Sequence, residues 1–154
     1  METTSRSRKE TLNLGKIIAR YLKPADILCL FGELGAGKTV LVKGIAAGLG
    51  IDKKKVSSPS FVLLRVHKKA GLCLYHFDLY RLTTPAAILC AGFEEYLYAE
   101  GVSVVEWAER LKHLMPKEFL KIELSVKGKN SRLLKISAFG ERYRQLLQQI
   151  ESRF

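Results

Sequence analysis

The 154 residues are enough for one compact domain, and a composition of 47% hydrophobic and 27% charged residues is ordinary for a soluble globular protein. No uninterrupted apolar stretch approaches the roughly 18 residues of a membrane span, and polar residues 1–10 lack the apolar segment of a signal peptide. The formal net charge of +11 is unusual, and it fits either solvated surface charge or an RNA or acidic-protein partner.

We therefore expect a flexible N-terminal tail over residues 1–10 and a single domain over residues 11–154. Within the domain, apolar residues at helical spacing predict an amphipathic helix over about residues 11–22. The apolar run 27–31 is typical of a buried parallel strand. Residues 32–39 then spell G-x-x-x-x-G-K-T, and apolar residues recur at helical spacing beyond them. Strand, glycine-rich loop and helix stand in the order that a phosphate-binding P-loop requires.

Each part of this P-loop has a mechanical role. Its glycines let the backbone curl and turn successive N–H groups inward, while the following helix adds the positive end of its dipole. Lys38 is expected to reach the β- and γ-phosphates, and the Thr39 hydroxyl to hold Mg²⁺. The residues expected around the phosphates are Glu33, Leu34, Gly35, Ala36, Gly37, Lys38, Thr39 and Val40. The chain is thus predicted to bind a nucleoside triphosphate or its diphosphate product.

The next segments predict further strands and short helices. Strand-like runs at residues 61–67 and 72–77 are joined by a short turn and predict a hairpin. Pro85 is expected to open a short helix, and a further helical stretch is expected over residues 93–98. Residues 102–105 are another candidate for a buried strand.

The C-terminal part shows two alternating runs and a polar helix. Residues 120–127 alternate apolar and polar side chains, as does the run 134–138 after a turn at residues 128–130. A final helix is expected over about residues 140–152. Together the elements predict an α/β, P-loop NTPase-like three-layer sandwich, with a parallel core sheet extended by antiparallel hairpins.

A P-loop needs an acidic residue at the end of a neighbouring strand, to hold Mg²⁺ or to orient the attacking water. Asp78 and Glu106 each follow an apolar strand, although either could instead cap a helix. Their spacing leaves open which of them touches the metal. Ser58 and Ser60 belong to a serine-proline segment that is either an ordinary turn or a switch whose hydroxyls reach Mg²⁺ or the γ-phosphate.

Four segments together resemble the TsaE (YjeE) family, whose members are bacterial ATPases required for threonylcarbamoyladenosine modification of tRNA. The segments are G-E-L-G-A-G-K-T at 32–39, S-P-S-F at 58–61, H-F-D-L-Y-R at 76–81 and V-E-W at 105–107. Mild departures are Glu33, where family members commonly have Asp, and Ser60, where they have Thr. The resemblance covers about residues 11–111.

The resemblance implies that Lys38 and Thr39 bind phosphate and Mg²⁺, and that Ser58 and Ser60 belong to a switch-like loop. It also implies that Asp78 and Glu106 coordinate the metal or activate water, and that the indole of Trp107 is part of the nucleotide site. It also implies an ATPase that uses Mg²⁺ and resets a complex of a threonylcarbamoyl transferase and its inactive paralogue (TsaD- and TsaB-like). Direct contact with tRNA stays open.

Two other functional classes are compatible with a P-loop. One is a small-molecule kinase, but no arginine-rich lid segment is found in the sequence. The other is a nucleotide-gated interaction module in which hydrolysis is incidental. A GTPase is disfavoured because the sequence has no N-K-x-D segment. The three scattered cysteines lack metal-site spacing and predict free, mostly buried thiols in a reducing cytoplasm.

Overall fold

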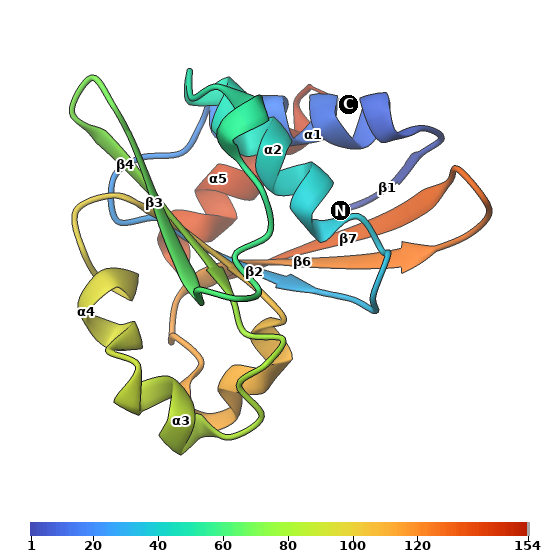
Figure 1. Ribbon diagram of the computed structural model, residues 1–154. Coiled ribbons are helices and arrows are strands. Elements are labelled where there is room, and N and C mark those ends of the chain that lie inside the picture. Colours follow the sequence, from blue (N-terminus) through green and yellow to red (C-terminus); the bar gives the residue numbers. More distant parts are fainter. Residues whose placement is uncertain (154) are drawn as a thin grey trace.

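The computed structural model describes residues 1–153, which form a sheet with helices on both of its faces (Figure 1). The strands are β1 (Glu2–Ser5), β2 (Ile27–Phe31), β3 (Leu64–Lys69), β4 (Leu72–Asp78), β5 (Val102–Glu106), β6 (Phe119–Val126) and β7 (Arg132–Phe139). The helices are α1 (Arg8–Ala19), α2 (Lys38–Gly48), α3 (Pro85–Cys90), α4 (Phe93–Leu97) and α5 (Glu141–Glu151), with 3-10 segments η1 (Lys53–Lys55) and η2 (Ala108–Leu114).

The strand order is β1-β7-β6-β2-β5-β4-β3. The central strand β2 runs parallel to both of its neighbours, β5 and β6, and β4 runs parallel to β5. The outer pairs β3–β4, β6–β7 and β1–β7 are antiparallel. This arrangement confirms the predicted α/β sandwich with a parallel core extended by antiparallel hairpins.

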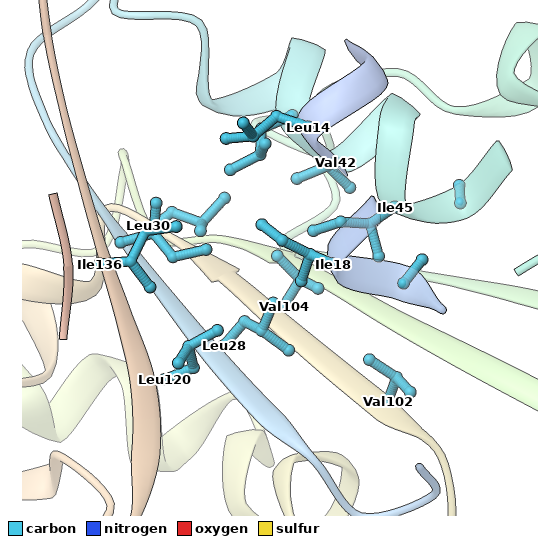
Figure 2. Close-up of a cluster of buried hydrophobic side chains, with 14 of the residues drawn as sticks. Leu14, Ile18, Leu28, Leu30, Val42, Ile45, Val102, Val104, Leu120 and Ile136 are labelled. Carbon is cyan, nitrogen blue, oxygen red and sulfur yellow. The ribbon is translucent and has the colours of Figure 1, made fainter. Parts of the chain in front are cut away.

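Alternate residues of β2 enter two separate hydrophobic cores, because successive side chains of a strand point to opposite faces. Leu28 and Leu30 pack with α1, α2 and α5 in a core that Figure 2 shows in part. Ile27 and Cys29 pack on the other face with side chains of α3, α4 and η2. The sheet is therefore buried on both sides around β2, which holds the loop that follows this strand in a fixed place.

The prediction of a flexible tail over residues 1–10 was wrong, because these residues form a strand and the start of a helix. Strand β1 pairs antiparallel with the outer edge of β7, where Thr3 lies opposite Leu134. Helix α1 then begins at Arg8, and the Ser7 hydroxyl caps it by accepting from the Glu10 N–H at 3.1 Å. The four residues of β1 are all polar and show no alternation of apolar and polar side chains. They form a strand because they pair with the edge of β7.

The start of the first hairpin strand also differs from that predicted. The first strand of the hairpin begins at Leu64 rather than at residue 61, because Leu63 has a positive φ of 65° and breaks the extended conformation. Residues 61–63 thus belong to the loop that carries Ser58 and Ser60. Within residues 1–153, no helix is long and apolar enough to cross a membrane.

Candidate functional site

The P-loop connects the end of β2 to the start of α2. Gly32, Gly35 and Gly37 have φ values of 137°, 79° and 102°, which side chains other than glycine rarely adopt. A Cβ at Gly32 would also lie 2.3 Å from the carbonyl oxygen of Leu124 on β6. Glycine is therefore required where the loop leaves the sheet, and the loop turns its backbone toward the N-terminus of α2, as an anion site needs.

Lys38 is the first residue of α2 and is only 4% exposed. Its ammonium group donates hydrogen bonds to the carbonyl oxygens of Gly32 and, at 3.0 Å, of Glu33. The same nitrogen lies 3.9 Å from the centre of the Trp107 ring, a cation–π contact. The lysine side chain is thus folded over the P-loop, and the indole lies against it.

Burial lowers the pKa of Lys38, and the nearby carboxylates of Glu106, Glu109, Asp78 and Glu33 oppose that shift. The acids and the lysine thus share one electrostatic environment. An additional anion beside Lys38, such as a phosphate group, favours the ammonium form for the same reason as these carboxylates do.

Thr39 and Glu106 are joined directly. The Thr39 hydroxyl lies 2.9 Å from both carboxylate oxygens of Glu106, which is 2% exposed. The Oε1 atom of Glu106 also accepts a hydrogen bond from Nε2 of the fully buried His76 at 2.7 Å. A chain of contacts therefore runs from β4 through β5 to the P-loop.

The strand order explains this contact. Strand β5 lies directly beside β2, with Glu106 opposite Leu30, one residue before the end of β2. Asp78 is opposite Glu106 on β4, one strand further from the P-loop. Both carboxylates thus meet at the carboxyl edge of the parallel sheet, but only Glu106 is in direct contact with the P-loop threonine.

Asp78 instead holds the serine-proline segment. One of its carboxylate oxygens accepts hydrogen bonds from the hydroxyls of Ser58 and, at 3.2 Å, Ser60. Its other oxygen accepts the backbone N–H of Tyr80 at 2.9 Å. The two serine oxygens are 2.6 Å apart. The segment predicted as a switch is therefore attached to the second carboxylate, not to the P-loop.

Trp107 follows Glu106 in the left-handed conformation, with φ 59° and ψ 41°. Its ring packs against Tyr80, with the ring centres 5.0 Å apart, as well as beneath Lys38. The turn at the end of β5 thus directs the carboxylate of Glu106 toward Thr39 and the indole toward Lys38.

These groups line one hollow of about 500 Å³. Its lining consists of residues 34–40 together with Ser58, Ser60, Phe61, Asp78, Tyr80, Arg81, Glu106 and Trp107. Glu33 takes part through its carbonyl group, which accepts from Lys38. At the mouth Arg81 lies over the ring of Phe61, which is 84% exposed. The residues predicted from the sequence therefore lie together.

A second, smaller hollow of about 230 Å³ lies on the other side of the P-loop and shares Gly35, Gly37 and Val40 with the first. Arg132, the first residue of β7, lines it. The guanidinium of Arg132 donates to the P-loop carbonyls of Ala36 at 3.1 Å and Gly35 at 3.3 Å. The β6–β7 hairpin is thereby fastened to the P-loop.

Sequence reasoning missed the part that two residues play in this site. A lone histidine within a strand gives no clear functional signal, although the position of His76 two residues before Asp78 puts both side chains on the same face of β4. Arg132 gave no local signal at all, because its contact with residues 35 and 36 depends on the β6–β7 hairpin lying next to β2.

Comparison with known proteins agrees with the geometry. A family model described as "Threonylcarbamoyl adenosine biosynthesis protein TsaE" matches residues 5–134. The protein named tRNA threonylcarbamoyladenosine biosynthesis protein TsaE in Bacillus subtilis (strain 168) is 39% identical over 142 residues, which are 92% of this chain and 88% of that protein. The equivalent protein of Rickettsia prowazekii (strain Madrid E) is 39% identical over 133 residues, 86% of this chain and 92% of that one.

A solved structure is also similar. The crystal structure of YdiB from Bacillus subtilis superposes with a TM-score of 0.85 at 34% sequence identity, covering 99% of this chain and 95% of that chain. The resemblance inferred from four short segments is thus confirmed over most of the sequence and over the fold. The chain belongs to the TsaE family.

Proposed function

We propose that the protein binds ATP with Mg²⁺ in the larger hollow and hydrolyses it to ADP and phosphate, in the service of tRNA threonylcarbamoyladenosine biosynthesis. That process is the one for which the matching family and the relatives are named. The observation that carries the hydrolytic part is the contact of the Thr39 hydroxyl with the Glu106 carboxylate. A P-loop hydroxyl and a carboxylate from the adjacent strand are the protein ligands that a nucleotide-bound Mg²⁺ uses.

The residues fit this metal. Thr39 and Glu106 offer oxygen atoms only, and Mg²⁺ prefers few protein oxygens because phosphates and water complete its octahedral shell. Both side chains end on the same side of the P-loop, where they now bond each other. When bound, Mg²⁺ supplies electrostatic stabilisation of the charge that develops on the phosphate oxygens. His76 would keep the carboxylate of Glu106 oriented through its hydrogen bond.

Phosphate oxygens would replace the two backbone carbonyl oxygens as the hydrogen-bond acceptors of Lys38. Its ammonium group already lies over the loop, so a small movement exchanges two carbonyl oxygens for phosphate oxygens. The hollow that Arg132 lines shares Gly35, Gly37 and Val40 with the larger hollow. We assign the nucleoside to that second hollow, since it adjoins the P-loop on the side away from Glu106.

Asp78 is assigned to the step that follows binding. It holds Ser58 and Ser60 and lies at the same sheet edge as Glu106. A carboxylate in this position orients the attacking water, and the attached serines form a segment that responds to the γ-phosphate. Trp107, against Lys38, completes the wall of the site.

The partner is assigned as the threonylcarbamoyl transferase together with its inactive paralogue, and the place of action as the cytoplasm. Support comes from the process in the relatives' names and from three cysteines that are free thiols. The arginine at the mouth of the larger hollow, Arg81, lies on Phe61 rather than over the P-loop. The isolated protein is therefore expected to hydrolyse ATP slowly, and the partner complex to accelerate it.

The test is phosphate release by Glu106→Gln, measured with Mg²⁺ and ATP in the presence of the partner complex. Loss of one carboxylate charge facing the metal should slow hydrolysis at least about tenfold. Glu95→Gln, which removes an exposed acid of α4 that does not line the hollow, is the matched control and should keep the wild-type rate. Wild-type turnover by Glu106→Gln would refute the metal-ligand assignment.

A further inference from the structure

Five lysines surround a shallow hollow of about 640 Å³ at the end of the molecule opposite the P-loop. They are Lys16, Lys53, Lys55, Lys68 and Lys69, and we call them the lysine surface. They come from α1, from η1 just beyond the end of α2, and from the tip of the β3–β4 hairpin. Figure 1 shows this hairpin tip and the end of α2 at the same end of the fold.

The positive charge of the lysine surface is not neutralised by ion pairs with carboxylates among residues 1–153. Among residues 1–153, none of its five side chains forms an ion pair with a carboxylate. The single acid at the hollow, Asp52, uses its carboxylate to accept the backbone N–H of Lys54 at 3.0 Å, which caps η1. Like charges gathered from three separate elements repel one another, so the concentration of charge costs stability unless a polyanion offsets it.

We propose that the lysine surface binds the phosphate backbone of a double-stranded RNA stem. Lysine ammonium groups are point charges that neutralise phosphates without reading bases. The other lining residues, Ala47, Gly50 and the buried Ile51, present no aromatic ring on which an unpaired base could stack. Recognition of single-stranded RNA depends on such rings, whereas recognition of a stem depends on shape and phosphates.

The same lining argues against an acidic protein as the occupant. Stable protein interfaces have an apolar core and are depleted in lysine. The lysine surface has the opposite composition, with five lysines and no exposed large apolar side chain among its lining residues.

The surface is separate from the nucleotide site, and the inference does not depend on ATP hydrolysis. Helix α2 has 11 residues, so its two ends are about 16 Å apart at 1.5 Å per residue. The P-loop lies at the first end and the lysine surface at the second. Substitutions in the lysine surface should therefore leave nucleotide affinity unchanged.

The experiment compares two variants of equal net charge by fluorescence anisotropy with a labelled 20-base-pair RNA duplex, over a range of KCl concentrations. The surface variant carries Lys53→Gln, Lys55→Gln, Lys68→Gln and Lys69→Gln. The control variant carries Lys9→Gln, Lys23→Gln, Lys117→Gln and Lys127→Gln, four exposed lysines elsewhere. ADP affinity, measured by calorimetry for both variants, reports on the nucleotide site independently.

We expect the surface variant to bind the duplex at least about tenfold more weakly than the wild type, with the slope of log K against log salt reduced by about one for each lost phosphate contact. In the control variant, the slope of log K against log salt should fall by less than half as much as in the surface variant. Equal losses in the two variants, tighter binding of the single strand than of the duplex, or tighter binding of a polyglutamate peptide than of the duplex would each overturn the proposal. Unchanged ADP affinity in the surface variant separates any such failure from failure of the proposed ATPase.

Discussion

Replacing Arg132 with alanine tests whether the β6–β7 hairpin shapes the P-loop. The substitution removes the guanidinium bonds to the carbonyls of Ala36 and Gly35, at 3.1 and 3.3 Å, and those to its own hairpin at Gly128 and Ser131. A hydrogen bond from a charged donor contributes about 1.5–3 kcal/mol when buried, and this side chain is half-exposed, so the two P-loop bonds together stabilise the loop by about 1–2 kcal/mol.

That free energy should be lost from nucleotide binding, because a loop that is no longer fastened must be ordered when the phosphates arrive. We expect the dissociation constant of ADP, measured by isothermal titration calorimetry, to rise about 5- to 30-fold in Arg132→Ala. Arg132→Lys keeps the charge but lacks the planar fork that reaches two carbonyls, so it should show most of the same loss.

Arg144→Ala is the control for general effects of losing an arginine, since Arg144 is exposed and, among residues 1–153, pairs only with Glu141 on the same helix. If Arg132→Lys binds ADP as the wild type does while Arg132→Ala does not, the guanidinium acts through charge rather than through its fork. Unchanged ADP affinity in both variants would show that the hairpin does not position the P-loop.

Four other outcomes are expected. Lys38→Ala should weaken ATP binding by about 2–4 kcal/mol in a calorimetric titration while circular dichroism stays native, because the charge that balances the phosphates is gone. Asp78→Asn should slow ATP hydrolysis at least about tenfold while ADP affinity changes less, since it contacts the serine segment rather than the P-loop. The fluorescence of Trp107, the only tryptophan, should change saturably on adding Mg²⁺-nucleotide, and the change should vanish in Lys38→Ala. Burial raises the pKa of the Cys29 thiol, so a thiol reagent should modify exposed Cys90 in the native protein and Cys29 only after denaturation.

The elements around the P-loop could be predicted because their signals are local. The run 27–31 is apolar at every position, as a strand covered on both faces must be, and the structure buries it on both faces. The alternation beginning at residue 120 likewise matches β6, which has one face against the core. Strand β1 escaped prediction because residues 2–5 are polar and short, and only the edge of β7 makes them a strand.

The roles of the two acids could not be separated from sequence, since Asp78 and Glu106 follow strands of the same character. Their difference is topological: β5 neighbours β2 and β4 does not. Nothing within either segment encodes that order. In the structure β4 pairs with β3 on its outer side and with β5 on its inner side, so β5 separates it from β2.

The proposed roles of the two carboxylates agree with their different neighbours. Glu106 bonds both the buried His76 and Thr39, so these hydrogen bonds fix the position of its carboxylate before any ligand arrives. Asp78 bonds Ser58 and Ser60, which belong to a loop whose Phe61 is 84% exposed. A metal ligand benefits from the first environment and a switch from the second. Asp78 and Glu106 are opposite each other across β4 and β5. We therefore propose that a partner which moves the serine loop changes the rate of hydrolysis through Asp78.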